Sequence, residues 1–538
     1  MKKFLSVVSL LMALMMLCTS ALANEQKYDE PVTVHFVRST DDTLDANYFS
    51  QHPDKTMTDN LWCDLFRDEL NINVEYDWIV KSGDEYNQKL AAELAVGAIP
   101  EFVNVTALQA KQLYEAGLIM PLDEIYNEYA TEQTKRVMLE TGTSPFDAVT
   151  FDGQLYALPV VDATLMIADL MWIRTDWLEK LNLPVPTTMD ELIATAKAFA
   201  EADFDGNGVN DTIGMAVSKT PWDQLFTLKG FFNAFDSYPE IWVDDGTGKL
   251  VYGSTLPGTK DALATLHQMY VDGLLDPEFA VKDDGKVAEA TTSGKCGIMF
   301  GAQNSIYPLQ NSKNLEPEGQ WQAFPIVTAT DHKAKAQTDV GTTAWTVVRK
   351  DCEHPEAVVK MYNLFIDKCW GPNNENGVYY APLDSESIWK LSPVTPTKPD
   401  KNLKAFLDLE AARQSGDFSQ VTGEGYSILQ KLQAFESGSE EGFALWGWER
   451  IYGAEGAYGV LNYYQENNLT QDMMFVGAPT ESMTLYMSYL KDLQNETFVK
   501  IITGEETIDA FDQFVENFYA NGGDAITEEV NAWYASLK

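Results

Sequence analysis

The chain has 538 residues, more than one hydrophobic core usually serves, so we expect two or three domains. Its 81 acidic and 38 basic residues give a formal net charge of −43, which opposes binding to nucleic acid, anionic lipid or polyanionic sugars and favours a neutral or cationic ligand. Beyond the N-terminal segment, four cysteines lack the spacing of a metal site, and their pairing is left open: Cys63, Cys296, Cys352 and Cys369.

The N-terminus has the pattern of a secretory signal peptide. Two lysines precede an apolar run over residues 4–17 and an Ala-Leu-Ala sequence at 21–23. The run is too short for a convincing membrane span, so we expect export and cleavage after Ala23. A bacterial lipoprotein signal needs a small residue before the acylated cysteine. Because Leu17 is bulky, a lipid anchor at Cys18 is the less favoured alternative.

Strands and helices alternate in the next part of the chain. Residues 32–37 and 72–76 show the alternating apolar pattern of strands, and residues 57–70 between them carry apolar side chains at helical intervals. Residues 86–96 then predict a helix and residues 101–105 a third strand. Repeated strand–helix–strand order predicts an α/β fold with a mostly parallel sheet covered by helices.

The alternation continues in the middle of the chain. A buried strand at 170–174 is followed by a helix at 187–202, for which Thr187 or Thr188 can act as the N-cap. Further strands are predicted at 294–301 and 341–348. Residues 371–400 are rich in proline, asparagine and glycine and predict an irregular region, and residues 402–538 predict a largely helical one.

Residues 203–212 have the outline of a calcium loop. Calcium is bound by six to eight oxygens, and alternate side chains around a glycine turn can supply them. The ligand positions one, three, five, seven and nine are filled by Asp203, Asp205, Asn207, the carbonyl of Val209, and Asp211, with Gly208 at position six. Position twelve is Gly214 rather than the glutamate of an EF-hand, so the missing ligand must be Thr212, water or a distant carboxylate. The alternative is an Asx-turn loop without a metal.

Several phrases in a fixed order resemble one protein family. They are residues 89–100, 152–159, 172–178 with 186–192, 475–480, and 496–504 with 522–534. Together they resemble the bacterial extracellular solute-binding proteins (family 1) of ATP-driven sugar importers, in the branch that includes LipO and the alginate-oligosaccharide binders. Each phrase alone is weak, and their order across nearly the whole mature chain is specific.

The resemblance implies a two-lobed, type II Venus-flytrap fold with a hinge and extra C-terminal helices. It implies a ligand cleft between the lobes, which close on the ligand and present a surface to a membrane permease. It also implies a structural calcium in the 203–212 loop, although Thr212 stands where the alginate binders have glutamate. The implied signal peptide is 1–23. The N-terminal lobe takes 24–150 and returns at 336–400, which also holds the hinge. The C-terminal lobe takes 151–335 and 401–538.

Sugar binding asks for aromatic rings that stack on C–H faces and for polar groups that bond hydroxyls. Arg38 and Asp41 follow the first strand, where ligands of open α/β sheets bind. The aromatic candidates are Trp222, Trp345, Trp370, Trp446 and Trp448. For each of these tryptophans, packing in the core is an equal alternative.

These observations predict a substrate-binding protein of an ABC importer. We expect a monomer on the periplasmic or extracellular face of the membrane that captures an oligosaccharide, delivers it to the permease subunits and catalyses no reaction. The alternatives are an oligopeptide receptor and a secreted, calcium-dependent carbohydrate-active enzyme. The sequence has no G-x-S-x-G elbow, complete P-loop or zinc spacing, but its 81 acidic residues leave a catalytic carboxylate pair open.

Overall fold

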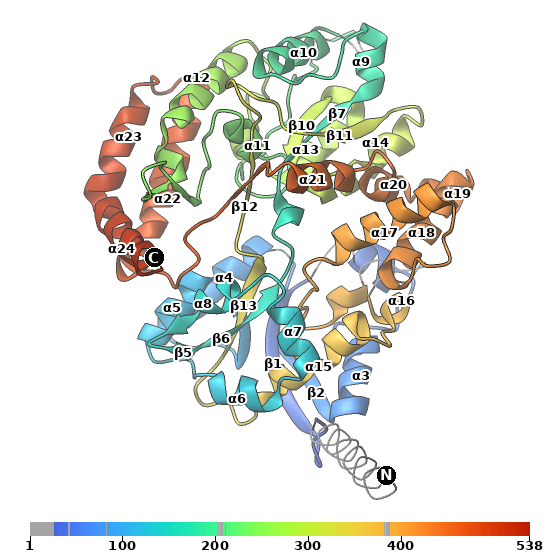
Figure 1. Ribbon diagram of the computed structural model, residues 1–538, viewed down its shortest axis with the longest axis vertical. Helices are drawn as coiled ribbons and strands as arrows, with labels where there is room; N and C mark the ends of the chain where they lie inside the picture. The colour runs from blue at the N-terminus through green and yellow to red at the C-terminus, as the bar shows by residue number, and fades with distance from the viewer. Residues whose placement is uncertain are drawn as a thin grey trace, which may run out of the picture. The chain divides into compact units, whose positions relative to one another are not determined.

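The computed structural model describes residues 26–40, 44–81, 83–202, 204, 208–209, 211–380, 382 and 388–537. The predicted signal peptide and Cys18 lie outside these residues. The chain divides into two compact units, drawn in Figure 1: unit 1 is Met1–Asp162 with Thr343–Lys398, and unit 2 is Ala163–Thr342 with Pro399–Lys538. Each unit is therefore built from two separate stretches of sequence.

The elements of unit 1 are as follows. Its strands are β1 (Val32–Ser39), β2 (Ile72–Val80), β3 (Phe102–Val105), β4 (Thr150–Phe151), β5 (Gln154–Leu155), β6 (Ala157–Val161) and β13 (Thr342–Val348). Its helices are η1 (Asp45–Phe49), α3 (Leu61–Leu70), α4 (Gly83–Val96), α5 (Ala107–Glu115), α6 (Asp123–Tyr129), α7 (Glu132–Met138), α8 (Ser144–Asp147), α15 (Glu356–Trp370), α16 (Asn376–Tyr379) and η7 (Ile388–Leu391).

In unit 1, β1 and β2 pair in parallel, and β3, β13 and β6 form a second sheet in that order. The Phe36 ring of β1 stacks on Phe102 of β3, with centroids 5.0 Å apart, and this contact joins the two sheets in one core. Helix α3 begins at the N-cap Asn60, whose side chain accepts two amide hydrogen bonds. Its Trp62 is fully buried and stacks on Phe365 of α15.

The strands of unit 2 form a central antiparallel sheet and two short pairs. They are β7 (Leu170–Arg174), β8 (Trp242–Asp244), β9 (Leu250–Tyr252), β10 (Ile298–Gly301), β11 (Trp321–Phe324), β12 (Ala336–Thr338) and β14 (Thr470–Asp472). The order in the central sheet is β10-β7-β11, and β7 in its middle is buried along its whole length. This burial explains the continuous apolar run at residues 170–173.

Helices make up most of unit 2. The first group is η2 (Leu165–Ile167), α9 (Thr175–Leu181), α10 (Met189–Glu201), α11 (Lys229–Asn233), η3 (Gly253–Thr255), α12 (Pro257–Val271), η4 (Phe279–Val281), α13 (Asp284–Ala290), η5 (Thr291–Lys295), η6 (Gln303–Leu309) and α14 (Gln310–Leu315). The second group is α17 (Lys401–Ser415), α18 (Gly423–Glu436), α19 (Glu440–Phe443), α20 (Trp446–Tyr452), α21 (Ala457–Glu466), α22 (Glu481–Thr503), α23 (Ala510–Phe518), η8 (Tyr519–Gly523) and α24 (Asp524–Ser536). Within this unit, α22–α24 pack together beside α12, whereas α17–α20 form a separate cluster (Figure 1).

Most of the predicted elements are confirmed, and β1 and β2 pair in parallel, but the prediction of a mostly parallel sheet is wrong. The α/β class, the helical C-terminal region and the capping of α10 by Thr188, with Glu191 completing a capping box, all agree with the prediction. The mostly parallel sheet does not, because β3 with β13 and β7 with both of its neighbours run antiparallel. The paired strands come from distant parts of the chain. The rule that strand–helix–strand units pair in parallel applies to consecutive strands, so it does not predict the direction of these pairs.

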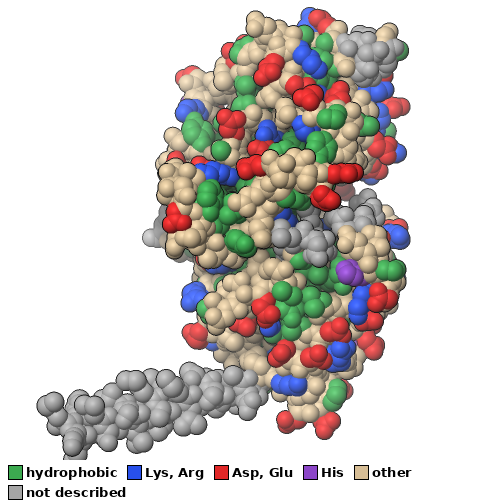
Figure 2. All heavy atoms as spheres, turned by 90° about the vertical axis from the view of Figure 1, so that its right-hand side faces the viewer, with side chains coloured by type: hydrophobic (Ala, Val, Ile, Leu, Met, Phe, Trp, Pro, Cys, Tyr) green, Lys and Arg blue, Asp and Glu red, His purple; other side chains and the backbone are tan. Residues whose placement is uncertain are grey.

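Charge is dispersed and the cysteines are buried. On the face drawn in Figure 2, acidic side chains are spread over the surface of each unit rather than gathered in one patch, in keeping with the net charge of −43. The cysteines Cys63, Cys296, Cys352 and Cys369 are buried thiols and form no disulfide. None of the helices in the described part of the chain combines the length and apolar character that crossing a membrane requires.

Asp169, which immediately precedes β7, is a buried carboxylate in the core of unit 2. Its exposed fraction is 1%, and its Oδ2 accepts a hydrogen bond of 2.7 Å from the Gly230 amide, while Oδ1 has no partner among the described residues. Burial raises the pKa of Asp169 to about 6, against the opposing effects of Lys229 and the Gly230 amide. The folded protein therefore holds this proton more tightly than the unfolded chain does.

We predict that Asp169→Asn removes one pH-dependent part of the stability. Because the folded pKa of about 6 lies above the unfolded value of 3.8, the stabilisation by this proton is fully present below pH 3.8 and is lost as the pH rises from there through 6. The loss amounts to about 2–3 kcal/mol of unfolding free energy by pH 7.5. Asparagine keeps an acceptor for Gly230 and does not titrate. Urea unfolding at pH 4.5 and pH 7.5 measures the difference.

The control for this prediction is Glu132→Gln, at a side chain that is 95% exposed. Its unfolding free energy should follow the wild-type pH dependence. If Asp169→Asn also follows the wild-type curve, the carboxylate of Asp169 is ionised in the folded state throughout this range and the prediction is wrong.

Candidate functional site

Unit 1 contains a cavity of about 380 Å³ beyond the carboxyl ends of β1 and β3. It is bordered by the end of β1, the first turns of α4, Asn104 of β3, and the segment that includes η7. The lining residues are Val37, Arg38, Ser39, Thr40, Gly83, Tyr86, Asn87, Asn104, Trp389, Lys390, Ser392, Pro393 and Thr395. Polar groups and the aromatic rings of Tyr86 and Trp389 therefore meet in a site of the size that holds a small ligand.

The amide of Asn104 is oriented by its neighbours. The Thr346 hydroxyl donates a hydrogen bond of 2.7 Å to Asn104 Oδ1, and the Tyr86 hydroxyl donates one of 2.9 Å to the Asn104 carbonyl. Burial raises the pKa of Tyr86, which keeps this hydroxyl protonated as a donor. Asn104 is thus a lining residue whose amide oxygen is engaged by Thr346 and whose Nδ2 group carries two N–H donors.

Trp389 belongs to an aromatic cluster at the other side of the cavity. Its ring lies nearly parallel to Tyr380, with an interplanar angle of 12° and centroids 5.7 Å apart. Tyr380 in turn packs edge-on against Trp370, whose indole nitrogen donates to the Pro396 carbonyl at 3.1 Å. The predicted ligand residue Trp370 thus contacts Tyr380, the ring that packs on Trp389, and is not itself among the lining residues.

Trp389 was missed by the sequence analysis because it lies in a region predicted to be irregular. The available signal was the single tryptophan within residues 371–400, a stretch rich in proline, asparagine and glycine. A large aromatic side chain in a stretch without helical or strand periodicity is not predicted to pack in a core. Trp389 could therefore have been named as a candidate for ligand binding.

Arg38 lines the cavity, but its guanidinium forms hydrogen bonds to other groups of the protein. Nη2 donates a hydrogen bond of 2.6 Å to the Lys390 carbonyl, and Nη1 is 3.5 Å from the Leu391 carbonyl and 3.4 Å from the Tyr76 hydroxyl. A guanidinium that bonds backbone carbonyls in this way holds the η7 segment against β1. The other residue predicted beside it, Asp41, lies outside the described residues.

The remaining candidate tryptophans differ in burial. Trp345 is 8% exposed and donates to the Pro145 carbonyl at 2.7 Å, and Trp446 is 1% exposed, so both pack in the interior. Trp222 is half-buried between Phe232 and Phe498, and donates to Asn495. These positions agree with the core alternative for Trp345 and Trp446.

Trp448, also in unit 2, has a more open position on α20. It is half-buried, packs edge-on against Tyr307 with centroids 5.9 Å apart, and stacks on Tyr452. The Lys431 ammonium lies 3.7 Å from its ring centroid, which is a cation–π contact. Tyr307 is 38% exposed, so this pair presents aromatic surface to solvent.

Only part of the predicted calcium loop is described. Asp203, Asp205 and Asn207 lie outside the described residues, and within the described part no cluster of three or more His, Cys, Asp or Glu side chains could hold a metal. Gly208 has a φ of 75°, the left-handed conformation that the turn at position six requires. The Val209 carbonyl accepts the Asp211 amide at 3.1 Å, and Thr212 is buried.

Both ends of this loop are anchored in unit 2. At its start, the Phe204 ring stacks on the buried Trp177, with centroids 3.9 Å apart and an interplanar angle of 9°. At its end, the Ile213 amide donates to the Lys295 carbonyl at 2.8 Å, and the Gly214 amide donates to the Leu274 carbonyl at 2.8 Å. The oxygen-only set of predicted ligands and the turn at Gly208 fit a hard cation such as calcium.

Comparisons with known proteins identify relatives along most of the chain. The family model for bacterial extracellular solute-binding proteins matches residues 55–368. Lipoprotein LipO of Bacillus subtilis (strain 168) is 24% identical over 487 residues, which cover 86% of this chain and 87% of LipO. The polygalacturonan/rhamnogalacturonan-binding protein YtcQ of the same strain is 23% identical over 481 residues, which cover 87% of this chain and 86% of YtcQ.

Solved structures share the fold. The alginate-binding protein AlgQ2, crystallised without calcium ion, superimposes with a TM-score of 0.64 at 15% identity, over 94% of this chain and 99% of AlgQ2. The ABC-transporter substrate-binding protein FusA of Streptococcus pneumoniae, as an EF-hand mutant in complex with fructo-nystose, superimposes with a TM-score of 0.64 at 14% identity, over 94% and 99% of the two chains. These matches support the two-lobed periplasmic-binding-protein fold.

We predict that Arg38→Met loosens the η7 segment. The substitution removes a charge-assisted hydrogen bond to the Lys390 carbonyl, and such bonds contribute about 1.5–3 kcal/mol. Amide exchange at Trp389 and Ser392, whose amides bond the carbonyls of Tyr380 and Trp389, should accelerate by a factor of about 10 or more. Hydrogen-exchange mass spectrometry of the peptide that contains these residues measures it.

A matched control is Arg67→Met, at a side chain that is 52% exposed and pairs with Asp64. Exchange in the η7 peptide should be unchanged by it. Equal exchange in the Arg38→Met and wild-type proteins would show that this guanidinium does not hold the segment.

Proposed function

Because the chain belongs to the family of bacterial extracellular solute-binding proteins, we propose that it captures an oligosaccharide outside the cell membrane and delivers it to the permease of an ATP-driven importer. The names of its relatives support this function. YtcQ is a polygalacturonan/rhamnogalacturonan-binding protein, and FusA binds fructo-nystose in its complex. Export and action as a monomer belong to the same proposal, and a lipid anchor at Cys18 remains its less favoured form.

The observation that carries the sugar proposal is the unit 1 cavity, which combines the Trp389 ring with the oriented Asn104 amide. A pyranose or furanose ring can lie against an aromatic face while its hydroxyls bond to side-chain amides and hydroxyls at the rim. Asn87, Ser392 and Thr395 add such groups. Among the described residues that line the cavity, none is a carboxylate, which disfavours a peptide bound through its amino terminus.

We assign different roles to the predicted ligand residues. In this proposal Trp389 is the stacking platform, Trp370 supports it through Tyr380, and Arg38 positions the segment that carries it. Trp448 with Tyr307 is the candidate platform of unit 2. Trp222 is retained as a half-buried candidate in the same unit, whereas Trp345 and Trp446 are proposed to act in packing only.

We further propose that calcium is a structural ion of unit 2, held by Asp203, Asp205, Asn207, the Val209 carbonyl and Asp211, with Thr212 or water completing the set. The positive φ of Gly208 and the anchoring of both loop ends support this assignment. The ion would neutralise clustered carboxylates and tie the end of α10 to the strand region that follows. In this role it stabilises the unit without contacting the sugar.

For ligand binding we predict that Trp389→Ala weakens the affinity for the recognised oligosaccharide by about 10- to 100-fold, because a central aromatic platform is lost. Isothermal titration calorimetry against a panel of neutral oligosaccharides, uronate oligosaccharides and peptides identifies the ligand and then measures the change. The matched control is Trp533→Ala, a half-buried tryptophan of unit 2 that does not line this cavity and should keep the wild-type affinity.

The same titrations separate the alternatives. Saturable peptide binding without sugar binding would replace the oligosaccharide by an oligopeptide. Products that accumulate during overnight incubation with a bound sugar would make the protein an enzyme. Unchanged affinity in Trp389→Ala, with sugar binding intact in the wild type, would place the sugar elsewhere.

For the ion we predict that chelation of calcium lowers the melting temperature by roughly 2–5 °C, since a ligand that binds only the folded state stabilises it by mass action. Asp205→Ala should abolish the difference between calcium and chelator. Asp245→Ala, in another acidic turn of unit 2, should retain the difference. Melting curves that are identical with and without calcium would favour an Asx-turn loop without a metal.

A further inference from the structure

Lys229, the first residue of α11, is a buried lysine of unit 2 with an exposed fraction of 9%. Three other lysines are buried in the described part of the chain, and the ammonium of each has a contact. Lys313 donates to a backbone carbonyl, and Lys360 and Lys431 lie against aromatic rings. Among the residues that the structure describes, none forms a hydrogen bond, ion pair or ring contact with the ammonium of Lys229. Its charge thus lacks the close partner that a buried charge normally has.

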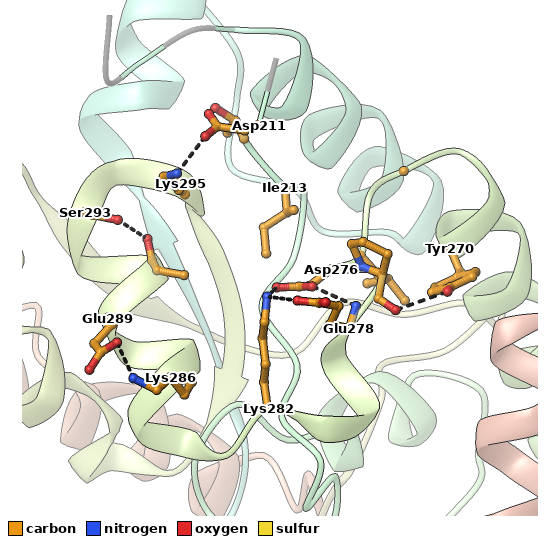
Figure 3. A pocket seen from close by; sticks show the side chains of 15 residues that line it. Asp211, Ile213, Tyr270, Asp276, Glu278, Lys282, Lys286, Glu289, Ser293 and Lys295 are labelled. Carbon is orange, nitrogen blue, oxygen red and sulfur yellow. Dashed lines mark hydrogen bonds and ion pairs between the residues drawn. The ribbon is translucent and has the colours of Figure 1, made fainter. Parts of the chain in front are cut away.

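The lysines beside a cavity of about 790 Å³ in the same unit differ from Lys229 in this respect. Lys282 pairs with Asp276 at 2.6 Å, and Lys286 pairs with Glu289 at 3.0 Å, as Figure 3 shows. Both of these lysine side chains are more exposed than that of Lys229. More exposed lysines therefore have carboxylate partners in this acidic chain, whereas the buried one does not.

The backbone fixes Lys229 at one edge of the central sheet of unit 2. The next residue, Gly230, donates its amide to Asp169 Oδ2 at 2.7 Å. A Cβ atom at Gly230 would lie 2.6 Å from the ring of Phe300 in β10, so glycine permits this close approach of α11 to the sheet. The Lys229 side chain therefore starts from a fixed point beside Asp169, which precedes β7.

A closed loop joins Lys229 to Trp222, the half-buried ligand candidate of unit 2. The Pro221 carbonyl accepts the Leu228 amide at 2.7 Å, and Trp222 and Lys229 directly follow these two bonded residues. The Trp222 ring also packs edge-on against Phe232 of α11, with centroids 5.3 Å apart. The indole ring and the ammonium therefore belong to one local structure.

Asp169 is not a close partner for this ammonium. Its Oδ2 bonds the Gly230 amide, and within the described part of unit 2 it forms no ion pair with Lys229. Attraction by Lys229 lowers the pKa of Asp169, but burial outweighs it and raises the pKa to about 6. A close ion pair would hold the pKa of a carboxyl below its usual value, so the two charges interact at longer range. Asp223 attracts Lys229 in the same indirect way.

We propose that Lys229 binds an acidic group of the ligand, so that the recognised oligosaccharide contains a sugar with a carboxylate. This inference rests on the proposed function and names the class of sugar. A carboxylate forms a charge-assisted hydrogen bond with an ammonium, which is about twice as strong as a bond between neutral groups. The low dielectric around a buried side chain strengthens it further. A neutral sugar offers only hydroxyls, which leave the charge without a counter-ion. Lys229 is thus a specificity-determining residue beside Trp222.

The test is calorimetric titration of the full chain at pH 7.5 with oligogalacturonates, oligomannuronates and oligoguluronates, each as the free acid and as the methyl ester. An acidic member should bind at least about 10-fold more tightly than its ester, because esterification removes the charge and keeps the shape. Lys229→Met should weaken binding of that acid by about 10- to 100-fold and change binding of the ester by less than about threefold. Lys229→Arg keeps the charge and should keep the preference for the acid. Lys229→Gln is a second neutral variant for the case that Lys229→Met does not fold.

The matched control is Lys249→Met, which removes the same charge from an exposed lysine of unit 2 and should keep the wild-type preference. Asp169→Asn removes a negative charge near Lys229 and should strengthen binding of the acid by about two- to fivefold. If Lys229 only compensates Asp169, Lys229→Met lowers the melting temperature and leaves the ratio of the two affinities unchanged, which would overturn the inference. Tight binding of a neutral oligosaccharide without preference for an acid would also overturn it, while the proposed function stands. If no oligosaccharide binds, both are wrong.

Discussion

The buried guanidinium of Arg174 connects the central sheet of unit 2 to the residues that anchor the start of the 203–212 loop. Arg174 ends the central strand β7 and is 1% exposed, so its charge must be fully compensated. Its Nε and Nη2 donate to Asp176 at 2.7 Å each, and Nη2 also donates to Glu316 at 2.7 Å. The same group lies 4.7 Å from the ring centroid of Trp177, the ring on which Phe204 stacks. A single side chain therefore couples the sheet to the start of the 203–212 loop.

The sequence predicted those features that local chemistry determines. The capping box at Thr188, the buried strand β7 and the helical C-terminal region depend on neighbouring residues, and each is confirmed. Strand direction and the partners of single tryptophans depend on contacts between distant segments, which periodicity does not encode. Trp345 illustrates this limit, because its strand was predicted correctly while its burial against Pro145 could not be.

The net charge of the chain is a weaker guide to the ligand than the charged side chains that line the cavity. A net charge of −43 argues against anionic ligands only if the charge surrounds the site. In the described lining of the unit 1 cavity the ionisable side chains are Arg38, Lys390 and Tyr86, and the guanidinium of Arg38 is turned to backbone carbonyls. Acidic side chains lie on the surface of each unit instead (Figure 2). The global charge therefore acts through solubility and long-range fields, and the cavity itself does not exclude an acidic sugar.

The same distinction between local and distant contacts applies to the 203–212 loop, which we propose as a calcium site. Ordering a flexible loop costs roughly 1–2 kcal/mol per residue in backbone entropy, and this cost is subtracted from the affinity for the ion. Here Phe204 stacks on Trp177 and the Ile213 amide bonds the Lys295 carbonyl, so the fold itself fixes both ends of the loop. A proposed site whose ends are already anchored needs fewer ligands than a fully flexible one, which is consistent with Gly214 standing at position twelve in place of the EF-hand glutamate. In the proposed site the charge of the ligands and the rigidity of the anchored ends would together set the affinity for the ion.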